Sequence, residues 1–323
     1  MFKKEVHQYS MGGKYIDSFP SISEAARAFG IDESTIRKSA IGIRNQAAGY
    51  KWSYSKIVDN TNKLPEGVKI LCLDIETAPS RAYVWGRWKQ NINQPQVISE
   101  WFMLSWAAKW LGEENIYSDR LSGEEVKSES DRRICASLWI MLNDANIVVA
   151  HNGDSYDIPK IQSRFLLNGL MPPAPYRQVD TLNVAKKQFG FSSNKLDSLA
   201  TYFEFGNKLD TDFTLWKNCM EGDEESLRYM EKYNKEDVVI LEKVYLKLRP
   251  YMKGHPNLDM YSDSGIPGCP ICGSIDIELE EDKSFYTQSS KFQVFRCKSC
   301  GGLSRSKQSD KPLVKKSISA IPK

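Results

Sequence analysis

The sequence has no long apolar segment. Among its 323 residues, no apolar run reaches the roughly 18–20 residues that a membrane-spanning helix needs. The start of the chain, Met1 to His7, turns polar at once and lacks the apolar stretch of a secretory signal peptide. We therefore expect no membrane span and a cytoplasmic location.

Cysteine is scarce, and its distribution does not suit a disulfide framework. The chain has seven cysteines, an odd number, and four of them form two Cys-x-x-Cys pairs. The other three, Cys72, Cys135 and Cys219, lie far apart in apolar or mixed segments. We expect these three to be buried, inert thiols.

The charge is distributed unevenly, although the net charge of the chain is only +3. Residues 1–55 carry eight Lys/Arg and five Asp/Glu, and residues 282–323 carry ten and two, so the remaining residues 56–281 are net −8. An acidic middle between two basic ends suits a carboxylate-rich metal site flanked by modules that seek phosphate. Uneven surface charge without a function is the alternative interpretation.

Composition divides the chain into blocks, with no internal repeat or low-complexity tract. We expect one domain at residues 1–54, a second at 66–253 and a third at 262–308. A basic tail at 309–323 has no periodicity and is expected to be disordered. A largely polar segment at 55–65 and a segment rich in Gly, Pro, Ser and Asp at 254–268 are typical of linkers.

The first block predicts a hairpin followed by two short helices. Strands at 6–10 and 15–19 flank Gly12-Gly13, a pair that suits a two-residue turn. Ser21 and Glu24 match a capping box for a helix that ends at Gly30. Asp32 can begin a second helix that extends to about Ala40, so the pair predicts a helix-turn-helix.

The second block alternates apolar runs with helical patterns. We expect an α/β fold with a mixed sheet flanked by helices. The expected strands are 68–73, 102–109 and 147–150, and the expected helices are 130–142, 157–167 and 225–248.

Two acids follow the first buried strand of this block. Alternation places Asp74 and Glu76 on one face, with Ile75 pointing into the core. Adjacent carboxylates repel each other unless a cation neutralises them. An isolated Asp-x-Glu is more often an exposed strand end, so this pair needs further support.

Two later segments supply that support. The strand at 147–150 leads into Asn152 and Asp157, and Asp157 is expected at a helix N-terminus, where a negative charge is favourable. Tyr233 and Asp237 are four residues apart in a helical pattern and therefore share a face. Taken alone, the first of these could be a helix cap and the second a surface pair.

Together the three segments resemble the three exonuclease motifs of the DEDD superfamily, the proofreading-type nucleases with a ribonuclease-H-like fold. Asp74, Glu76 and the following Thr77 match the first motif, and Asn152 through Asp157 match the second. Tyr233 and Asp237 match the third motif in its tyrosine form, because the position that histidine would take is Lys232. The resemblance covers about residues 66–250 and includes 180–182 and 195–199.

This resemblance implies a metal-dependent 3′→5′ exonuclease that acts on the 3′ end of DNA, expected to be single-stranded. Asp74, Glu76, Asp157 and Asp237 would hold two Mg²⁺ or Mn²⁺ ions about 4 Å apart, with Asp74 bridging them. Tyr233 would orient the attacking water, and Asp157 would support the ions through water. Nucleic-acid contacts are implied for Glu76, the backbone of Thr77, and Asn152.

Tryptophans lie between the first two expected strands of this block. Trp85, Arg87 and Trp88 fall in an expected loop, where aromatic and basic residues can contact a nucleic-acid strand. It is equally compatible with the sequence that these three side chains are exposed and contact no nucleic acid. Trp106 and Trp110 lie in or beside a strand pattern, so core packing is favoured for them.

The third block holds the two Cys-x-x-Cys pairs. One pair is Cys269 and Cys272, which Gly273 follows directly. The other is Cys297 and Cys300, which Gly301 follows directly. Four thiolates at this spacing suit one tetrahedral Zn²⁺ with a structural role, so the segment resembles a zinc ribbon. Its basic surroundings could contact phosphate or another protein.

The first block resembles the modular DNA-binding repeat that accompanies intron-encoded homing nucleases. The similarity lies in the Tyr9 strand, residues 19–22, 24–26, 34–36 and the closing 49–52. It implies a small core of Ala25, Ala26, Phe29 and Ile36. It also implies DNA contacts by four residues of the second helix: Ser34, Thr35, Arg37 and Lys38.

Two other functions stay open from sequence. The fold type also serves 3′→5′ exoribonucleases, so RNA is a second candidate substrate. A non-catalytic DNA-binding regulator on a nuclease scaffold is the third, and the intact acids argue against it. A proofreading role would require a separate polymerase or replication partner. The combination of modules suggests a phage or mobile element by analogy only.

Overall fold

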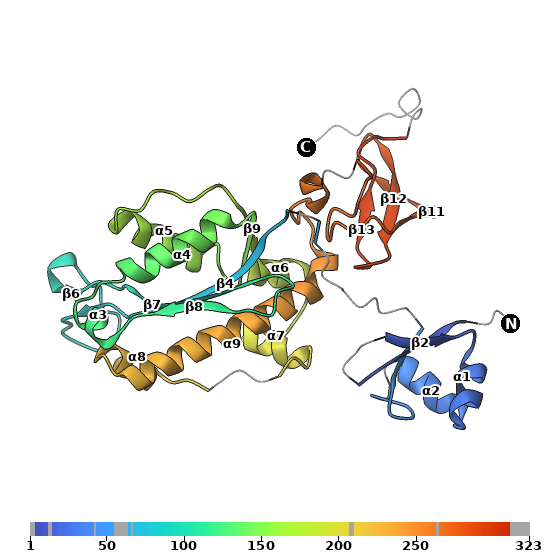
Figure 1. The fold of residues 1–323 in the computed structure, drawn as a ribbon, viewed down its shortest axis with the longest axis horizontal. Helices are drawn as coiled ribbons and strands as arrows, with labels where there is room; N and C mark the ends of the chain where they lie inside the picture. Colours follow the sequence, from blue (N-terminus) through green and yellow to red (C-terminus); the bar gives the residue numbers. More distant parts are fainter. Residues whose placement is uncertain are drawn as a thin grey trace. The chain divides into compact units, whose positions relative to one another are not determined.

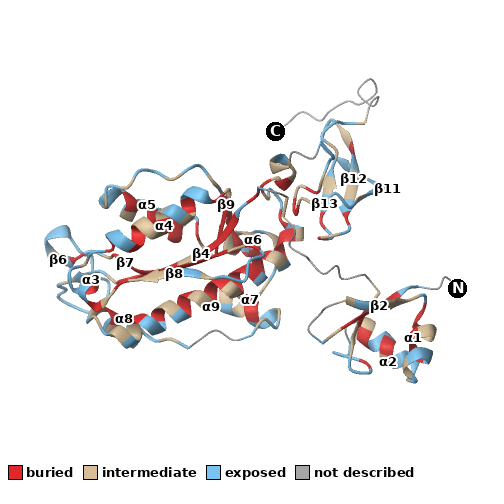
Figure 2. Cartoon of the chain, viewed as in Figure 1, coloured by how far each residue is buried: buried red, intermediate tan, exposed pale blue. Residues whose placement is uncertain are grey.

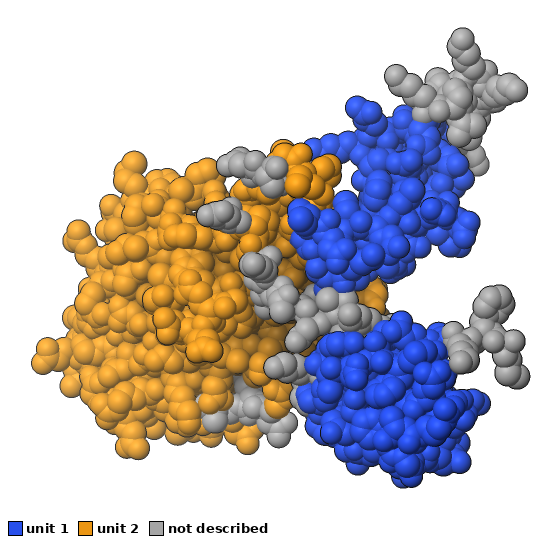
Figure 3. Space-filling view, turned by 45° about the vertical axis from the view of Figure 1, so that its right-hand side comes forward, with its two compact units in different colours: residues 1–61, 274–323 blue, residues 62–273 orange. Residues whose placement is uncertain are grey.

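The computed structural model describes residues 4–11, 15–41, 43–54, 64–65, 67–206, 210–262 and 265–310. These fall into two compact units, residues 62–273 and residues 1–61 with 274–323 (Figure 3). The division follows Gly273 and therefore lies inside the expected zinc ribbon. The expected Gly12-Gly13 turn, the tail from Lys311 and most of the 55–65 linker lie outside the described residues.

A five-stranded mixed sheet is the centre of the larger unit. Its strand order is β10-β9-β4-β7-β8. The strands β4, β9 and β10 run parallel to one another, whereas β7 pairs antiparallel with β4, and β8 pairs antiparallel with β7. The mixed sheet with flanking helices confirms the expected fold class. The strands are β4 (Ile70–Thr77), β7 (Met103–Trp110), β8 (Tyr117–Arg120), β9 (Ile147–Ala150) and β10 (Arg177–Asp180).

Helices cover both faces of this sheet (Figure 1). On one face lie α4 (Arg132–Asp144) and α5 (Asp157–Leu167). The other face is covered by α7 (Leu196–Tyr202) and the long α9 (Glu224–Leu248), and α6 (Thr181–Gln188) contributes to the same core. Buried residues accordingly line both sides of the strands (Figure 2).

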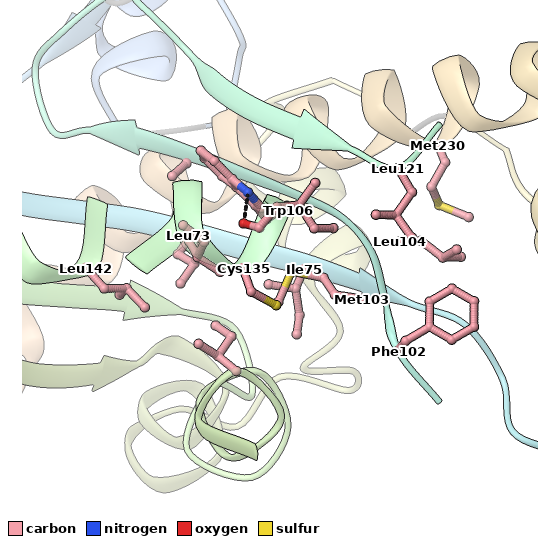
Figure 4. Close-up of a cluster of buried hydrophobic side chains, with 14 of the residues drawn as sticks. Leu73, Ile75, Phe102, Met103, Leu104, Trp106, Leu121, Cys135, Leu142 and Met230 are labelled. Atoms are coloured by element: carbon pink, nitrogen blue, oxygen red, sulfur yellow. Dashed lines mark hydrogen bonds between the residues drawn. The ribbon is translucent and has the colours of Figure 1, made fainter. Parts of the chain in front are cut away.

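The central strand β4 divides its side chains between these two cores. Leu71, Leu73 and Ile75 join the cluster that contains the buried residues of α4 and α5 (Figure 4). Ile70 and Cys72 join the cluster that contains α6, α7 and α9. Because side chains alternate along a strand, the next even-numbered residues, Asp74 and Glu76, belong to the α9 face.

Trp106 and the three isolated cysteines lie where the sequence predicts. The Trp106 indole packs in the first core and donates a hydrogen bond to the Ile134 carbonyl at 2.9 Å (Figure 4). Cys72, Cys135 and Cys219 are buried free thiols. Burial raises the pKa of all three, that of Cys219 to about 12, so they stay protonated and inert at neutral pH.

A buried ion pair fixes α5 against the sheet. The Asp131 carboxylate is fully buried and accepts hydrogen bonds from the Met103 backbone at 2.9 Å and from Arg164 Nε at 2.6 Å. Asn168 donates to it as well, at 2.8 Å. Since Arg164 and Asn168 lie at the end of α5 and Met103 begins β7, this carboxylate holds the helix that begins at Asp157 in place.

Several elements of the larger unit were not expected from sequence. The strand β4 is longer than expected, so Asp74 and Glu76 lie within it. Part of the expected 254–268 linker forms η3 (Leu258–Tyr261), and Leu258 is buried in the α9 core. The remaining short elements are β5 (Arg81–Ala82), η1 (Gln94–Gln96), β6 (Val97–Ser99), α3 (Gly123–Lys127), α8 (Phe213–Met220) and η2 (Arg249–Tyr251).

The N-terminal module has its own small core. The strands β1 (Val6–Tyr9), β2 (Tyr15–Phe19) and β3 (Lys51–Ser53) form an antiparallel sheet in the order β2-β1-β3. The helices α1 (Ile22–Phe29) and α2 (Glu33–Ala40) begin after the caps Ser21 and Asp32, as predicted. Val6, Ile22, Ala47 and Trp52 complete the core around the predicted residues, of which Phe29 is only partly buried.

The C-terminal segment is an antiparallel sheet. It consists of β11 (Ile277–Tyr286), β12 (Lys291–Cys297) and β13 (Leu303–Arg305), with β12 in the centre. Within the residues that the structure describes, no helix is long and apolar enough to cross a membrane.

Candidate active site

Three predicted carboxylates come together between β4 and α9. Asp74, Glu76 and Asp237 each offer an oxygen, and these oxygens lie within 4.8 Å of one another. The two strand residues reach this place by alternation, and Asp237 reaches it because α9 packs on the same face. Such close carboxylates repel each other, so the arrangement is favourable when a cation shares their charge.

Asn234 orients one of these acids. Its side-chain amide donates to Asp74 Oδ2, and its amide oxygen accepts from Ser105 Oγ at 3.5 Å. Asn234 is fully buried and lies three residues before Asp237 on the same face of α9. Sequence reasoning assigned it no role, although it lies inside the third motif.

Asp157 begins α5 on the other side of β4. Its carboxylate is buried and accepts a hydrogen bond from the Ile75 backbone at 3.3 Å. Burial raises the pKa of this carboxyl to about 7, and the charge of Asp180 acts in the same direction, while the backbone hydrogen bond opposes them. Asp157 lies outside the group of three converging oxygens, but it lines the same pocket.

Tyr233 lies one helical turn before Asp237. Its ring is largely buried and packs edge-on against Trp216 of α8, with the ring centroids 6.4 Å apart. This contact limits the positions of the phenol. Trp216 is a second residue that sequence reasoning missed, because its contribution depends on the packing of α8 on α9.

All five predicted catalytic residues line one pocket of about 320 Å³. Sequence reasoning did not assign a role to three of its other residues, His151, Tyr156 and Lys195, although they lie in or beside segments that carry the resemblance. The His151 ring is held by Thr181 at 2.8 Å and by the Asn194 carbonyl at 3.0 Å. The complete lining is Asp74, Ile75, Glu76, His151, Tyr156, Asp157, Leu182, Lys195, Leu196, Tyr233 and Asp237.

Thr77 lies at the edge of this pocket. Its hydroxyl is 3.0 Å from the Tyr156 hydroxyl and accepts a hydrogen bond from Lys160 Nζ at 3.2 Å. Burial lowers the pKa of Lys160, while the charge of Asp157 opposes that shift. The edge therefore presents a phenol and a cation beside the acidic group.

Asn152 occupies a turn next to the pocket and not its wall. Its φ is 72°, in the left-handed region that asparagine tolerates better than most residues. Its backbone N–H donates to Asp180 Oδ1 at 3.0 Å, and Asp180 also caps α6. The structure thus gives Asn152 a local role in the turn, and its contact with a nucleic-acid strand stays a prediction.

The predicted DNA-contacting residues share one helix of the N-terminal module. Ser34, Arg37 and Lys38 are exposed on α2, whereas Thr35 is half-buried. Thr35 also lines a pocket of about 250 Å³ with residues that sequence reasoning did not single out. These are Arg44, Asn45, Gln46, Ala47 and Ala48.

The four paired cysteines also converge. The sulfurs of Cys269, Cys272, Cys297 and Cys300 lie within 4.8 Å of one another, and all four residues are buried. After each pair the chain turns through a glycine with positive φ, 79° at Gly273 and 74° at Gly301, as the sequence predicts.

Two family models match parts of this chain. A family model described as the RNase_H superfamily matches residues 71–249, a range that contains every residue of the carboxylate pocket. The chain belongs to the RNase_H superfamily. A second family model, described as the NUMOD1 domain, matches residues 4–40 of the N-terminal module.

Two individual proteins are similar to parts of this RNase_H superfamily member. An uncharacterized HNH endonuclease, L245, of Acanthamoeba polyphaga mimivirus is 41% identical over 56 residues, which is 17% of each chain. The family B DNA polymerase of the archaeon Pyrobaculum calidifontis has a TM-score of 0.44 and 17% identity, over 62% of this chain and 26% of the polymerase. The chain thus spans only a minor part of the length of either protein.

The donor atoms fit two kinds of metal. Converging carboxylate oxygens, as in the first group, are the ligands that Mg²⁺ and Mn²⁺ prefer, and RNase H-like nucleases generally use divalent metals. Four buried thiols at short range are the donor set of a structural Zn²⁺ site.

The role of Asn234 can be tested directly. Replacing it by alanine removes the donor that orients Asp74, and such supporting residues typically change metal affinity or activity by about 10–100-fold. We expect Asn234→Ala to weaken Mn²⁺ binding by that order in titration calorimetry. Asn143→Ala, which removes an exposed amide elsewhere in the unit, should bind Mn²⁺ like the unmodified chain. Equal affinities for all three proteins would show that Asn234 does not position Asp74.

Proposed function

We propose that this protein is a metal-dependent 3′→5′ exonuclease. It would hydrolyse the phosphodiester bond at the 3′ end of single-stranded DNA and release nucleoside monophosphates. The observation that carries the proposal is the convergence of Asp74, Glu76 and Asp237 on one pocket with Asp157 and Tyr233, within an RNase_H superfamily domain. The 3′→5′ direction rests on the resemblance to the tyrosine form of the exonuclease motifs.

Four carboxylates and one amide would form the metal site. Asp74, Glu76 and Asp237 would hold two Mg²⁺ or Mn²⁺ ions, with support from Asp157. When bound, such a pair of ions lowers the pKa of a water molecule and stabilises the leaving 3′ oxygen. Asn234 keeps one oxygen of Asp74 fixed.

Two further side chains would act on the reacting groups. The Tyr233 phenol would donate a hydrogen bond to the attacking water and orient it toward the phosphorus. Its packing against Trp216 limits the directions that this bond can take. Lys195 lines the same pocket, and its ammonium group would contact a phosphate of the strand.

The proposal predicts a specific cleavage pattern on 5′-labelled single-stranded DNA. With Mg²⁺ or Mn²⁺ the chain should produce a ladder that shortens from the 3′ end, and EDTA should abolish it. Asp74→Ala should lower the rate by about 10³-fold or more, because it removes a ligand that both ions would share. Denaturing gels measure the ladder, and Asp144→Ala, an exposed acid on the same unit, is the matched control.

The other outcomes separate the alternatives. Preferential degradation of a matched RNA would identify an exoribonuclease. If neither nucleic acid is shortened but DNA is bound, the domain is a binding scaffold and the exonuclease proposal is wrong.

We also propose that Cys269, Cys272, Cys297 and Cys300 bind one structural Zn²⁺ as a zinc ribbon, which their converging sulfurs support. A structural zinc contributes directly to folding. A strong chelator should therefore remove one zinc per chain and melt the 262–308 segment, while the nuclease core, once resupplied with Mg²⁺, stays folded. Atomic absorption measures the metal and circular dichroism the structure. An unchanged spectrum after zinc loss would refute the structural role.

The N-terminal module is proposed to bind DNA through the exposed face of α2, which the NUMOD1 match and its two basic residues support. Each phosphate contact contributes about 0.9 to the slope of binding affinity against salt, in logarithmic units. Replacing Arg37 and Lys38 by alanine should weaken binding to long DNA and lower this slope by roughly two. Arg27→Ala on α1 is the matched control for lost charge. Binding that keeps its affinity and salt slope would exclude α2 as the contact.

A further inference from the structure

An aromatic loop leaves the nuclease domain directly after the catalytic strand β4. We define it as residues 79–100. Its base is closed by a backbone hydrogen bond from Ala78 to the Phe102 carbonyl at 2.8 Å and by the short pairing of β5 with β6. The loop therefore starts and ends at one place on the domain.

Large aromatic side chains of this loop point away from the protein. Trp85 is 98% exposed, Trp88 83% and Tyr83 74%. Leaving such rings in water costs free energy that burial would recover, so a group of exposed apolar rings usually marks an interaction surface. Trp106, which follows the loop in sequence, is instead buried in the core, where large apolar rings are usually found.

The loop holds its shape through its own polar groups. Gln96 donates to the Tyr83 carbonyl at 3.1 Å and accepts from the Asn93 backbone at 2.9 Å. Gln90 donates to the Trp88 carbonyl at 2.7 Å. These hydrogen bonds involve backbone carbonyl and N–H groups of the loop and no aromatic ring. The rings are therefore available for a ligand.

The charge of the loop is opposite to that of its domain. The loop contains three basic residues and one acid, Glu100, so it is net +2 within a part of the chain that is net −8. Arg81 is paired with Glu129, but Arg87 and Lys89 form no ion pair with any described residue. Flat rings interleaved with free cations are complementary to bases and phosphates, whereas a purely apolar partner would leave the cations unmatched.

The base of the loop meets the edge of the carboxylate pocket. On one side Thr77 contacts Tyr156, which lines that pocket. On the other side Lys160 Nζ lies 3.9 Å from the centre of the Trp101 ring and also bonds to Thr77. A strand whose 3′ end lies among the carboxylates can therefore continue along the loop.

We propose that the aromatic loop guides single-stranded DNA into the carboxylate pocket by stacking Trp85 and Trp88 on bases upstream of the terminal nucleotide, with Arg87 and Lys89 on the phosphates. The assignment of the terminal nucleotide rests on the proposed exonuclease function, whereas the stacking itself does not.

Kinetics on two lengths of single-stranded DNA test the guide. In the full-length chain, Trp85→Ala with Trp88→Ala should raise KM for a strand of about 12 nucleotides by roughly tenfold or more, since stacking on each ring contributes substantially to affinity. The kcat at saturation should stay within about twofold, because neither ring contacts the reacting phosphate. A trinucleotide, which offers few bases upstream of its 3′ end for stacking, should show a much smaller difference in KM between the two proteins than the longer strand. Tyr251→Ala, which removes a ring that is 66% exposed beyond the far end of α9, should behave like the unmodified chain.

A binding measurement separates the guide from the chemistry. The Asp74→Asn chain without added Mg²⁺ or Mn²⁺ should show tryptophan fluorescence quenching on addition of the same single-stranded DNA, and the loop substitutions should remove most of that quenching. If the chain cleaves DNA but the loop substitutions change neither KM nor the fluorescence quenching, the guide is wrong and the exonuclease proposal stands. Quenching that depends on the loop, without any cleavage of DNA, would support the guide and refute the exonuclease. RNA that quenches while DNA does not would overturn the assignment to DNA.

Discussion

Strand β4 is buried on both faces, and the rest of the nuclease domain depends on that constraint. Its odd-numbered residues pack in the core beneath α4 and α5. Its even-numbered residues face the core beneath α9. A shift of register by one residue would exchange the two sets and bury Asp74 and Glu76 among leucines and valines, at a large desolvation cost. The apolar residues of β4 therefore determine where its acids lie.

The acidic group carries a cost that the surrounding structure has to offset. Three carboxylates within 4.8 Å repel one another, and Asn234 offsets part of this repulsion by donating to Asp74. Asp131 contributes from the opposite face, because its ion pair with Arg164 fixes α5 and thereby the position of Asp157. Both supporting residues are fully buried, so any movement of α5 or α9 relative to the sheet would break hydrogen bonds that water cannot replace.

The sequence predicted the parts of this domain that have a clear local signal. The buried strands are short apolar runs, and the acids could be assigned to faces by periodicity alone. The spacing of Tyr233 and Asp237 predicted their common helix face, and the structure places both in the pocket. The match of an RNase_H superfamily model to residues 71–249 agrees with the fold predicted there.

What the sequence did not predict depends on contacts between distant residues. Asn234 and Trp216 look like ordinary helical residues until α8, α9 and β4 are packed together. The strands β8 and β10 are mostly polar and have no apolar run, so their pairing with β7 and β9 could not be recognised beforehand. The burial of Leu258 was not predicted either. Its Gly- and Pro-containing surroundings are typical of a linker, but it packs in the core.

The sequence distance across the carboxylate group has a consequence for the timing of synthesis. The contact between Asp74 and Asn234 joins residues 160 positions apart, and Asp237 follows only after that. At about 5–20 residues per second, a ribosome needs roughly 10–30 seconds to travel from the first of these acids to the last. During that interval the growing chain lacks Asp237, so the group of three carboxylates cannot form before α9 has been made.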